Sequence, residues 1–223
     1  MHRILVINPN SSHACSAGID AALAPFRWRG GPSFDVATLA EGPPAIYDWR
    51  DWHAVVDPMC RLIAREPADV YVVACGSDPG IEAARAVTRQ PVFGVFRSAV
   101  AAAVARAERF GVIAIVASSE ARHRAALRAM GLEARLAAEV PLNVSMETLL
   151  EPVTARARMA AAAKLLTEAG AETIVLACTG MAHHRAAVED AAGVPVIEPC
   201  QAAAAQALLA TCPGQTAGSA GMA

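Results

Sequence analysis

The sequence predicts an α/β fold with two pseudo-symmetric lobes, each a mainly parallel sheet flanked by helices, and a functional site in the cleft between them. The first observation behind this prediction is a repeat. Tyr71–Ser77 and Ile174–Gly180 are both apolar runs that end in Ala-Cys and continue with small or hydroxyl-bearing residues. Such runs are typical of buried strands in parallel sheets. The second observation is that strand-like and helix-like segments alternate along the chain, which favours parallel sheets with right-handed crossovers.

The repeat extends beyond the two cysteine-bearing runs. Upstream, Ile4–Ile7 resembles Val112–Ile115. Downstream, Gln90–Phe93 resembles Val194–Ile197. One α/β unit therefore occurs twice, and each copy places one cysteine at the end of a strand. We expect a first lobe of residues 1–97 plus 198–212, a second lobe of residues 98–197, and a disordered tail at 213–223, which is rich in small residues with Pro and Gly.

The individual elements follow from local pattern and from capping residues. Helix starts are indicated by Ser11 or Ser12 and by Asp78-Pro79, while Pro152 is expected to break a long helix. The expected strands are 4–7, 34–37, 71–75, 91–95, 112–117, 134–140, 174–178 and 194–197. The expected helices are one after residue 12, then 53–66, 81–87, 98–107, 120–130, 144–169, 182–192 and 201–210.

Composition excludes several classes of function. The net charge of −2 gives no electrostatic case for binding nucleic acid or an anionic membrane. The apolar run near the N-terminus is too short for a signal peptide, and no run approaches membrane-spanning length, so we expect a cytoplasmic protein. Lys164 is the only lysine and sits in the middle of an expected Ala-rich helix, which argues against Schiff-base chemistry.

Two of the six cysteines stand out. None of the six forms a CxxC pair, so the sequence supports neither a thioredoxin-type nor a zinc-ribbon site. In a reducing compartment the cysteines serve packing or catalysis. The duplicated context favours catalysis for Cys75 and Cys178. Packing is favoured for the other four, namely Cys15, Cys60, Cys200 and Cys212.

Two matched thiols at strand ends predict a particular chemistry. Backbone N–H groups and the helix dipole at such a position favour the thiolate, so we expect a pKa below the free value of ~8.5. A thiolate can remove a proton from carbon, and a thiol on the opposite face can return one. Racemisation of a stereocentre beside a carbonyl needs this arrangement. Donors to the resulting oxyanion are expected from the N–H groups after each cysteine and from Ser77 or Thr179.

Other polar or aromatic residues carry weaker signals. Asn8 lies at an expected strand end, where its carboxamide serves either the turn or a polar substrate. Tyr47, Trp49 and Trp52 are expected to cover a helix face, and an active-site lid is the less favoured alternative. Arg97 follows an expected strand, where it either binds a carboxylate or is a solvated arginine at a helix start. The adjacent His183 and His184 are expected to point in different directions, which argues against a shared metal.

Three motifs in order resemble the aspartate/glutamate/hydantoin racemase superfamily. They are Ile4–Ser12, Ala74-Cys75 with Asp78-Pro79-Gly80, and Leu176–Met181. The likeness runs from about residue 3 to residue 210 and is closest to the hydantoin and allantoin racemase branch. It implies two lobes related by pseudo-two-fold symmetry, a small-molecule substrate, cofactor-independent catalysis and a homo-oligomer. It also implies an acid/base pair, Cys75 and Cys178, each serving one enantiomer, and a pocket lined by Asn8, Ser77, Ser118, Ser119, Thr179 and Gly180.

Departures from the branch leave the substrate open. Gly76-Ser77 stands where the hydantoin branch usually has a bulky residue and then Asp, and Gly94–Arg97 stands where it tends to have Gly-Ile-Gly-Glu. A hydantoin-like, amino-acid, aryl-malonate or maleate-like substrate is therefore compatible with the resemblance. The alternative functions are a cysteine-dependent decarboxylase, a cis–trans isomerase of small dicarboxylates and, outside enzymes, a small-molecule binding protein.

Overall fold

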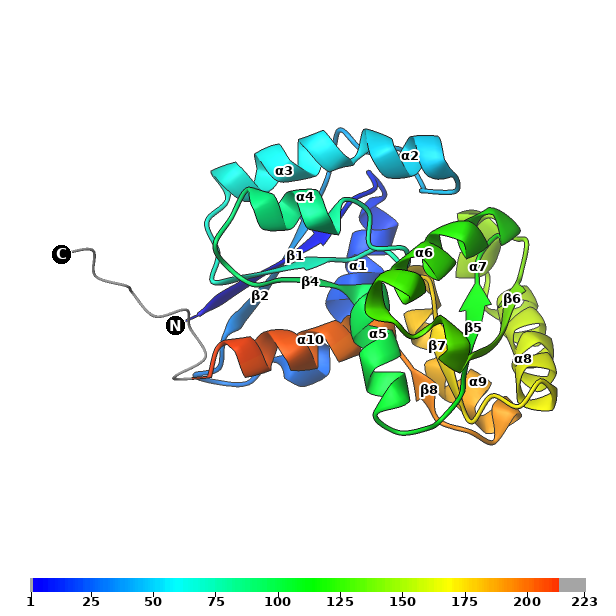
Figure 1. The fold of residues 1–223 in the computed structure, drawn as a ribbon. Helices are drawn as coiled ribbons and strands as arrows, with labels where there is room; N and C mark the ends of the chain where they lie inside the picture. Colours follow the sequence, from blue (N-terminus) through cyan, green and yellow to red (C-terminus); the bar gives the residue numbers. More distant parts are fainter. Residues whose placement is uncertain (1, 213–223) are drawn as a thin grey trace.

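The computed structural model describes residues 2–212, apart from the side chains of residues 150 and 152, and confirms the α/β class with two parallel sheets (Figure 1). The first sheet has the order β2-β1-β3-β4 and contains β1 (Arg3–Asn8), β2 (Ser33–Thr38), β3 (Val70–Val73) and β4 (Val92–Gly94). The second has the order β6-β5-β7-β8 and contains β5 (Phe110–Ala114), β6 (Leu136–Pro141), β7 (Thr173–Leu176) and β8 (Val196–Ile197).

The two sheets have the same strand order, so the repeat in the sequence is also a repeat in space. β3 pairs with β1 in the register Ile4↔Val70, and β7 pairs with β5 in the register Gly111↔Ile174. Every residue of β3 and of β7 is buried, because helices cover both faces of each sheet. Parallel strands put their carboxyl ends at one edge of the sheet, and both cysteines follow such an end.

The first sheet lies between two helical layers (Figure 1). One face packs against α1 (His13–Ala22) and α10 (Pro199–Ala210), as the shared core of Ile4, Ile19 and Ala203 shows. The other face packs against α3 (Val56–Arg65) and α4 (Ile81–Ala86), through Met59 and Ile81. The short α2 (Trp49–Ala54) and the 3₁₀ turn η1 (Ala24–Phe26) complete this part of the chain.

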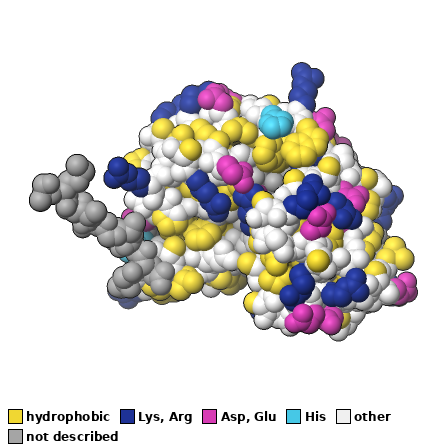
Figure 2. Space-filling view, in the orientation of Figure 1, with side chains coloured by type: hydrophobic (Ala, Val, Ile, Leu, Met, Phe, Trp, Pro, Cys, Tyr) yellow, Lys and Arg dark blue, Asp and Glu magenta, His cyan; other side chains and the backbone are white. Residues whose placement is uncertain are grey.

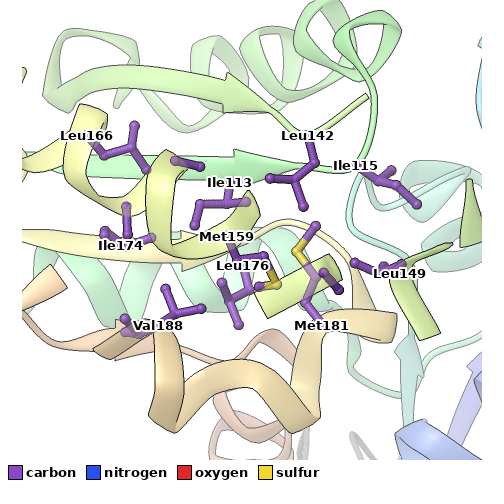
Figure 3. Close-up of a cluster of buried hydrophobic side chains, with 14 of the residues drawn as sticks. Ile113, Ile115, Leu142, Leu149, Met159, Leu166, Ile174, Leu176, Met181 and Val188 are labelled. Carbon is purple, nitrogen blue, oxygen red and sulfur yellow. The ribbon is translucent and has the colours of Figure 1, made fainter. Parts of the chain in front are cut away.

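The second sheet is covered in the same way. α8 (Pro152–Glu168) and α9 (Arg185–Ala192) bury one face, with Met159 and Val188 packed against Ile174 and Leu176 (Figure 3). The other face packs against α5 (Val95–Val104) and α6 (Glu120–Met130), where Phe96 shares a core with Leu127. The remaining elements are α7 (Met146–Leu150) and the 3₁₀ turns η2 (Ala117–Ser119), η3 (Glu133–Arg135) and η4 (Thr179–His184).

The expected lobe boundaries remain predictions. Val95 belongs to a core of the first sheet, Phe96 belongs to a core of the second, and Ala203 of α10 packs in the same core as Val95. The expected disordered tail at 213–223 lies outside the described residues. No helix within residues 2–212 has both the length and the apolar character needed to cross a bilayer. On the face in Figure 2, acidic and basic side chains are interspersed.

Several helix boundaries differ from the expected ones. The expected helix over 53–66 is two helices, α2 and α3. The expected helix over 144–169 is divided into α7 and α8, with Pro152 at the start of α8 as its missing N–H allows. The expected helix over 182–192 begins as the 3₁₀ turn η4 and becomes α-helical only at Arg185.

Asp78 does not cap the helix that follows it, contrary to the prediction. The residue before α4 is Gly80, at φ +62°, and no side chain caps that helix. The Asp78 carboxylate instead accepts hydrogen bonds from the N–H groups of Phe96 (2.8 Å) and Arg97 (2.9 Å) at the start of α5. A Cβ at Gly94 would lie 2.2 Å from the Asp78 carboxyl carbon, so glycine is required there. This long-range cap explains why α5 begins three residues before the expected position.

Candidate active site

A small cavity lies where the carboxyl ends of the two sheets meet. Residues from both halves of the chain line it, among them Tyr47, Cys75, Ser77, Arg122, His123 and Cys178. Its volume of about 40 Å³ holds about three water molecules at ~10–15 Å³ each. The cavity is therefore small in this conformation, and it is partly open to solvent.

The two cysteine-bearing segments touch each other at this cavity. A Cβ built on Gly76 would lie 2.0 Å from the carbonyl oxygen of Ala177 and 3.1 Å from the backbone nitrogen of Cys178. Only a residue without a side chain permits this approach of backbone to backbone. Because Gly76 directly follows Cys75, the contact brings the two cysteines to one cavity, where both side chains are partly exposed.

The surroundings of Cys75 both oppose and favour its thiolate. Burial raises the pKa of the thiol, whereas the backbone N–H and the hydroxyl of Ser77 and the charge of Arg122 lower it. The Cys75 Sγ lies 3.9 Å from the Ser77 Oγ. The expectation of a lowered pKa at the strand end is not met, since removal from water outweighs the local donors. The Ser77 N–H and hydroxyl are the main groups that favour charge on this sulfur, and the Arg122 cation in the cavity wall adds a smaller contribution.

Cys178 lies in a less polar setting. Burial raises the pKa of its thiol to about 12, the N–H of Gly180 lowers it, and a negative charge on Cys75 raises it further. Its Sγ lies 4.0 Å from the Sδ of Met146. With one local donor and an apolar neighbour, this thiol is held in its protonated form in this conformation. The two sulfurs are thus similar in position but different in environment.

Arg122 and His123 line the cavity and were not among the residues singled out from the sequence. Arg122 is 3% exposed and donates to the carbonyl oxygens of Ser118 and Tyr47, each at 3.1 Å. His123 is 1% exposed and its Nδ1 lies 2.8 Å from an oxygen of Glu139. Both stand on the first turns of α6, just after the carboxyl end of β5. The signal available was their position three and four residues after Ser119, which places them over that strand end.

Three of the predicted pocket residues line the cavity. These are Ser77, Ser119 and Thr179. The Ser119 hydroxyl donates to the carbonyl of Val116 at 2.5 Å, so it is already engaged. Ser77 comes two residues after Cys75, whereas Thr179 directly follows Cys178.

The other three predicted pocket residues, Asn8, Ser118 and Gly180, do not line this cavity. The Asn8 amide donates to Asn10, to the Ser12 carbonyl and to Ser16, and its oxygen accepts from the Asn10 N–H, so it organises the turn. Asn10 lines the cavity instead.

Ser118 and Gly180 are close to the site without facing the cavity. Ser118 is exposed, and its hydroxyl donates to the Tyr47 carbonyl at 2.5 Å. Gly180 lines a neighbouring cavity, and a Cβ there would lie 2.8 Å from the Met146 methyl carbon and 3.6 Å from the Cys178 Sγ. Its role at the site is the N–H that favours charge on Cys178.

Tyr47 and Trp52, which were expected to cover a helix face, make hydrogen bonds at the cavity. Tyr47 lines the cavity, its hydroxyl accepts from the N–H of Met146 at 2.9 Å, and its carbonyl accepts from Ser118 and Arg122. The Trp52 indole donates to the Ser77 carbonyl at 3.1 Å. The segment that joins the first sheet to α2 is therefore fastened to the second half of the chain across the cavity.

The remaining candidates lie away from the cavity. Arg97 pairs with Glu82 at 2.6 Å. His183 lines the neighbouring cavity, and its ring centroid lies 3.8 Å from that of His184, so the prediction that the two point apart is wrong. Within residues 2–212, no three His, Cys, Asp or Glu side chains are grouped as a metal ion would require.

Comparisons with known proteins agree with this architecture. The family model described as Asp/Glu/Hydantoin racemase matches residues 4–207. The chain is 33% identical over 209 residues to a hydantoin racemase from Paenarthrobacter aurescens, covering 90% of this chain and 87% of that protein. It is 34% identical over 227 residues to a hydantoin racemase from Rhizobium meliloti, covering 94% and 89%.

Solved structures give the same result. An allantoin racemase from Klebsiella pneumoniae superposes with a TM-score of 0.87 at 26% identity, covering 94% of this chain and 87% of that one. A glutamate racemase from Bacillus anthracis superposes with a TM-score of 0.72 at 17% identity, covering 97% and 84%, and this second likeness shows the fold alone.

Proposed function

Because the chain belongs to the Asp/Glu/Hydantoin racemase family and is an isomerase, we propose that it inverts a stereocentre beside a carbonyl. In this proposal Cys75 and Cys178 are the acid/base pair, and the reaction needs no cofactor. The observation that carries the proposal is the contact at Gly76, which brings two equivalent strand ends together so that both thiols line one cavity.

The proposed reaction uses one sulfur on each face of the substrate. A thiolate on one side takes the proton from the stereocentre, so a C–H bond breaks, an S–H bond forms and the electron pair moves onto the adjacent carbonyl. The thiol on the other side then gives its proton to the planar carbon, and its sulfur becomes the thiolate. The reverse reaction starts from the opposite sulfur, which suits a site assembled from two equivalent strands.

The substrate class follows from the relatives. The similar proteins are described as hydantoin and allantoin racemases, so we propose a 5-substituted hydantoin or a related cyclic ureide, with amino acids as the alternative. Such a ring is larger than a cavity of about 40 Å³. We therefore expect the segment that carries Tyr47 to move away from α7 and α6 when substrate enters. A homo-oligomer is a further expectation from the family.

Racemisation measured by polarimetry over 5-substituted hydantoins, allantoin, aspartate and glutamate tests the proposal. We expect activity with at least one of them in the wild type and its loss in both Cys75→Ser and Cys178→Ser. A decarboxylase protonates a planar intermediate with one cysteine, so tolerance of either substitution would contradict the two-cysteine mechanism. Saturable binding without turnover in the wild type would instead indicate a binding protein.

A further inference from the structure

We propose that Arg122 and His123 form the subsite that holds the carbonyl oxygen on which negative charge collects when the stereocentre loses its proton. This inference rests on the proposed function and adds two groups to the cysteine pair. The sequence suggested the N–H groups after each cysteine as oxyanion donors. In the structure the N–H groups of Ser77 and Gly180 favour charge on the sulfurs instead. Donors elsewhere in the cavity wall are therefore the ones to consider for the oxygen of the intermediate.

Arg122 is a buried cation whose charge Asp48, Asp51 and Glu139 stabilise only from beyond ion-pair distance. Its two terminal nitrogens donate to backbone carbonyls, and its guanidinium carbon lies 5.8 Å from the centre of the Trp49 ring. Among the described side chains, no carboxylate lies within ion-pair distance, and the buried Nε has no hydrogen-bond partner. A buried charge is unfavourable unless a counter-charge is close. The cavity that Arg122 lines is where such a charge can arise, first on Cys75 and then on the substrate oxygen.

His123 adds a second donor in a fixed orientation. Its ring stacks on Phe96 with centroids 4.5 Å apart, and its Nδ1 contacts Glu139, which stands opposite Val112 on the neighbouring strand. The Nε2 is buried and has no partner within the described part of the chain. This cavity-lining imidazole therefore has one ring nitrogen, Nε2, that no described protein group uses and that donates when it carries the ring proton. Glu139 is then a positioning residue, because it acts through the imidazole.

The proposed subsite completes the proton transfer described above. When the thiolate takes the proton, the carbonyl gains an electron pair and its oxygen becomes negative. Arg122 and His123 donate to that oxygen. When the second thiol protonates the carbon, the electron pair returns from the oxygen to the new C–H bond and the carbonyl is restored. Donors that are fixed before the reaction in a site with little water are effective at stabilising such charge. The same subsite can in principle hold a permanent carboxylate of an amino-acid substrate, and kinetics separate the two sources.

The test compares Arg122→Gln and His123→Gln with two matched controls. Arg97→Gln and His184→Gln each replace a side chain that also has a buried nitrogen without a partner in the described chain but does not line the cavity. We expect kcat to fall about 100-fold or more in the first two with KM within about threefold of wild type, as for loss of an oxyanion donor. The controls should keep kcat within about threefold. A raised KM with unchanged kcat would mean ground-state carboxylate binding and would overturn the proposal.

Glu139→Gln tests positioning separately from folding. We expect kcat to fall about 10- to 100-fold and its pH profile to change, because an amide in place of the carboxylate alters the hydrogen bond that orients the His123 ring. A change in melting temperature alone, with the wild-type pH profile, would mean that Glu139 is only structural.

A binding measurement keeps the proposal testable even if none of the chosen compounds is racemised. The barbiturate anion is a planar ring with charge shared by its carbonyl oxygens, and uracil is a neutral planar counterpart. We expect wild-type protein to prefer barbiturate in calorimetric titrations and Arg122→Gln to lose at least tenfold of that preference. Turnover failing while this preference holds would remove the proposed function and leave the anion subsite. Wild-type racemisation with unchanged kcat and unchanged preference in both variants would overturn the subsite alone.

Discussion

Gly76→Ala is expected to separate the two halves of the site with little damage to the rest of the fold. The new Cβ would lie 2.0 Å from the Ala177 oxygen and 2.4 Å from its carbonyl carbon. Relaxed contacts between heavy atoms are about 3.5 Å, so the two backbone segments must move apart by about 1–1.5 Å. A displacement of about 1 Å at reacting groups can cost about 100-fold in rate, or about 2.7 kcal/mol of transition-state stabilisation.

The measurement is kcat/KM for racemisation together with thermal unfolding. We expect at least a 100-fold loss in kcat/KM, while overpacking lowers the free energy of unfolding by about 1–3 kcal/mol. Gly18→Ala is the matched control, because a Cβ there meets nothing within 4 Å and alanine favours the interior of α1. A Gly76→Ala protein that racemises within about threefold of wild type would refute the view that this contact sets the spacing of the thiols.

Three further predictions concern stability and the cavity wall. Gly94→Ala should lower the free energy of unfolding in urea by about 1–3 kcal/mol, because its Cβ displaces the Asp78 carboxylate that caps α5. The pKa of Cys178 is about 12 in the folded protein, against an ordinary value of 9.0. Because the folded state holds this proton more tightly than the unfolded state, the free energy of unfolding is highest below pH 9 and falls as pH rises toward 12. Urea titrations should show a decline of at most about 4 kcal/mol over that range, reduced in Cys178→Ser. Tyr47→Phe removes the acceptor for the Met146 N–H and should cost about 1 kcal/mol of stability and raise KM.

The parts of the fold that follow from local pattern were predictable from the sequence. β3 and β7 are continuous apolar runs, and their duplication indicated two equivalent sheets, each with a cysteine at the end of a strand. The break at Pro152 follows from the chemistry of one residue. These features depend on residues close in sequence, which a single chain displays directly.

The features that were missed depend on contacts between distant segments. Asp78 caps α5 from a different part of the chain, and no residue near Phe96 in the sequence indicates this contact. Arg122 and His123 sit on a helix whose periodicity does not reveal which face meets a cavity. Tyr47 reaches the site through a loop, where pattern carries little information.

The direction of the pKa shifts of Cys75 and Cys178 could not be predicted from the sequence either. Local N–H donors at a strand end are visible from the motif, but the amount of water excluded around Cys75 and Cys178 depends on how both halves close over them. Asn8 stands at the predicted strand end, but its amide is used by its own turn and by Ser16 of α1.

The most direct test of the account is the position of deuterium early in the reaction in D₂O, starting from a single enantiomer and followed by chiral chromatography with mass spectrometry. Two sulfurs on opposite faces predict that the newly formed enantiomer carries deuterium while the remaining starting enantiomer does not. Equal labelling of both enantiomers from the first turnovers would mean that one group removes and returns the proton, and would contradict the pairing of Cys75 with Cys178.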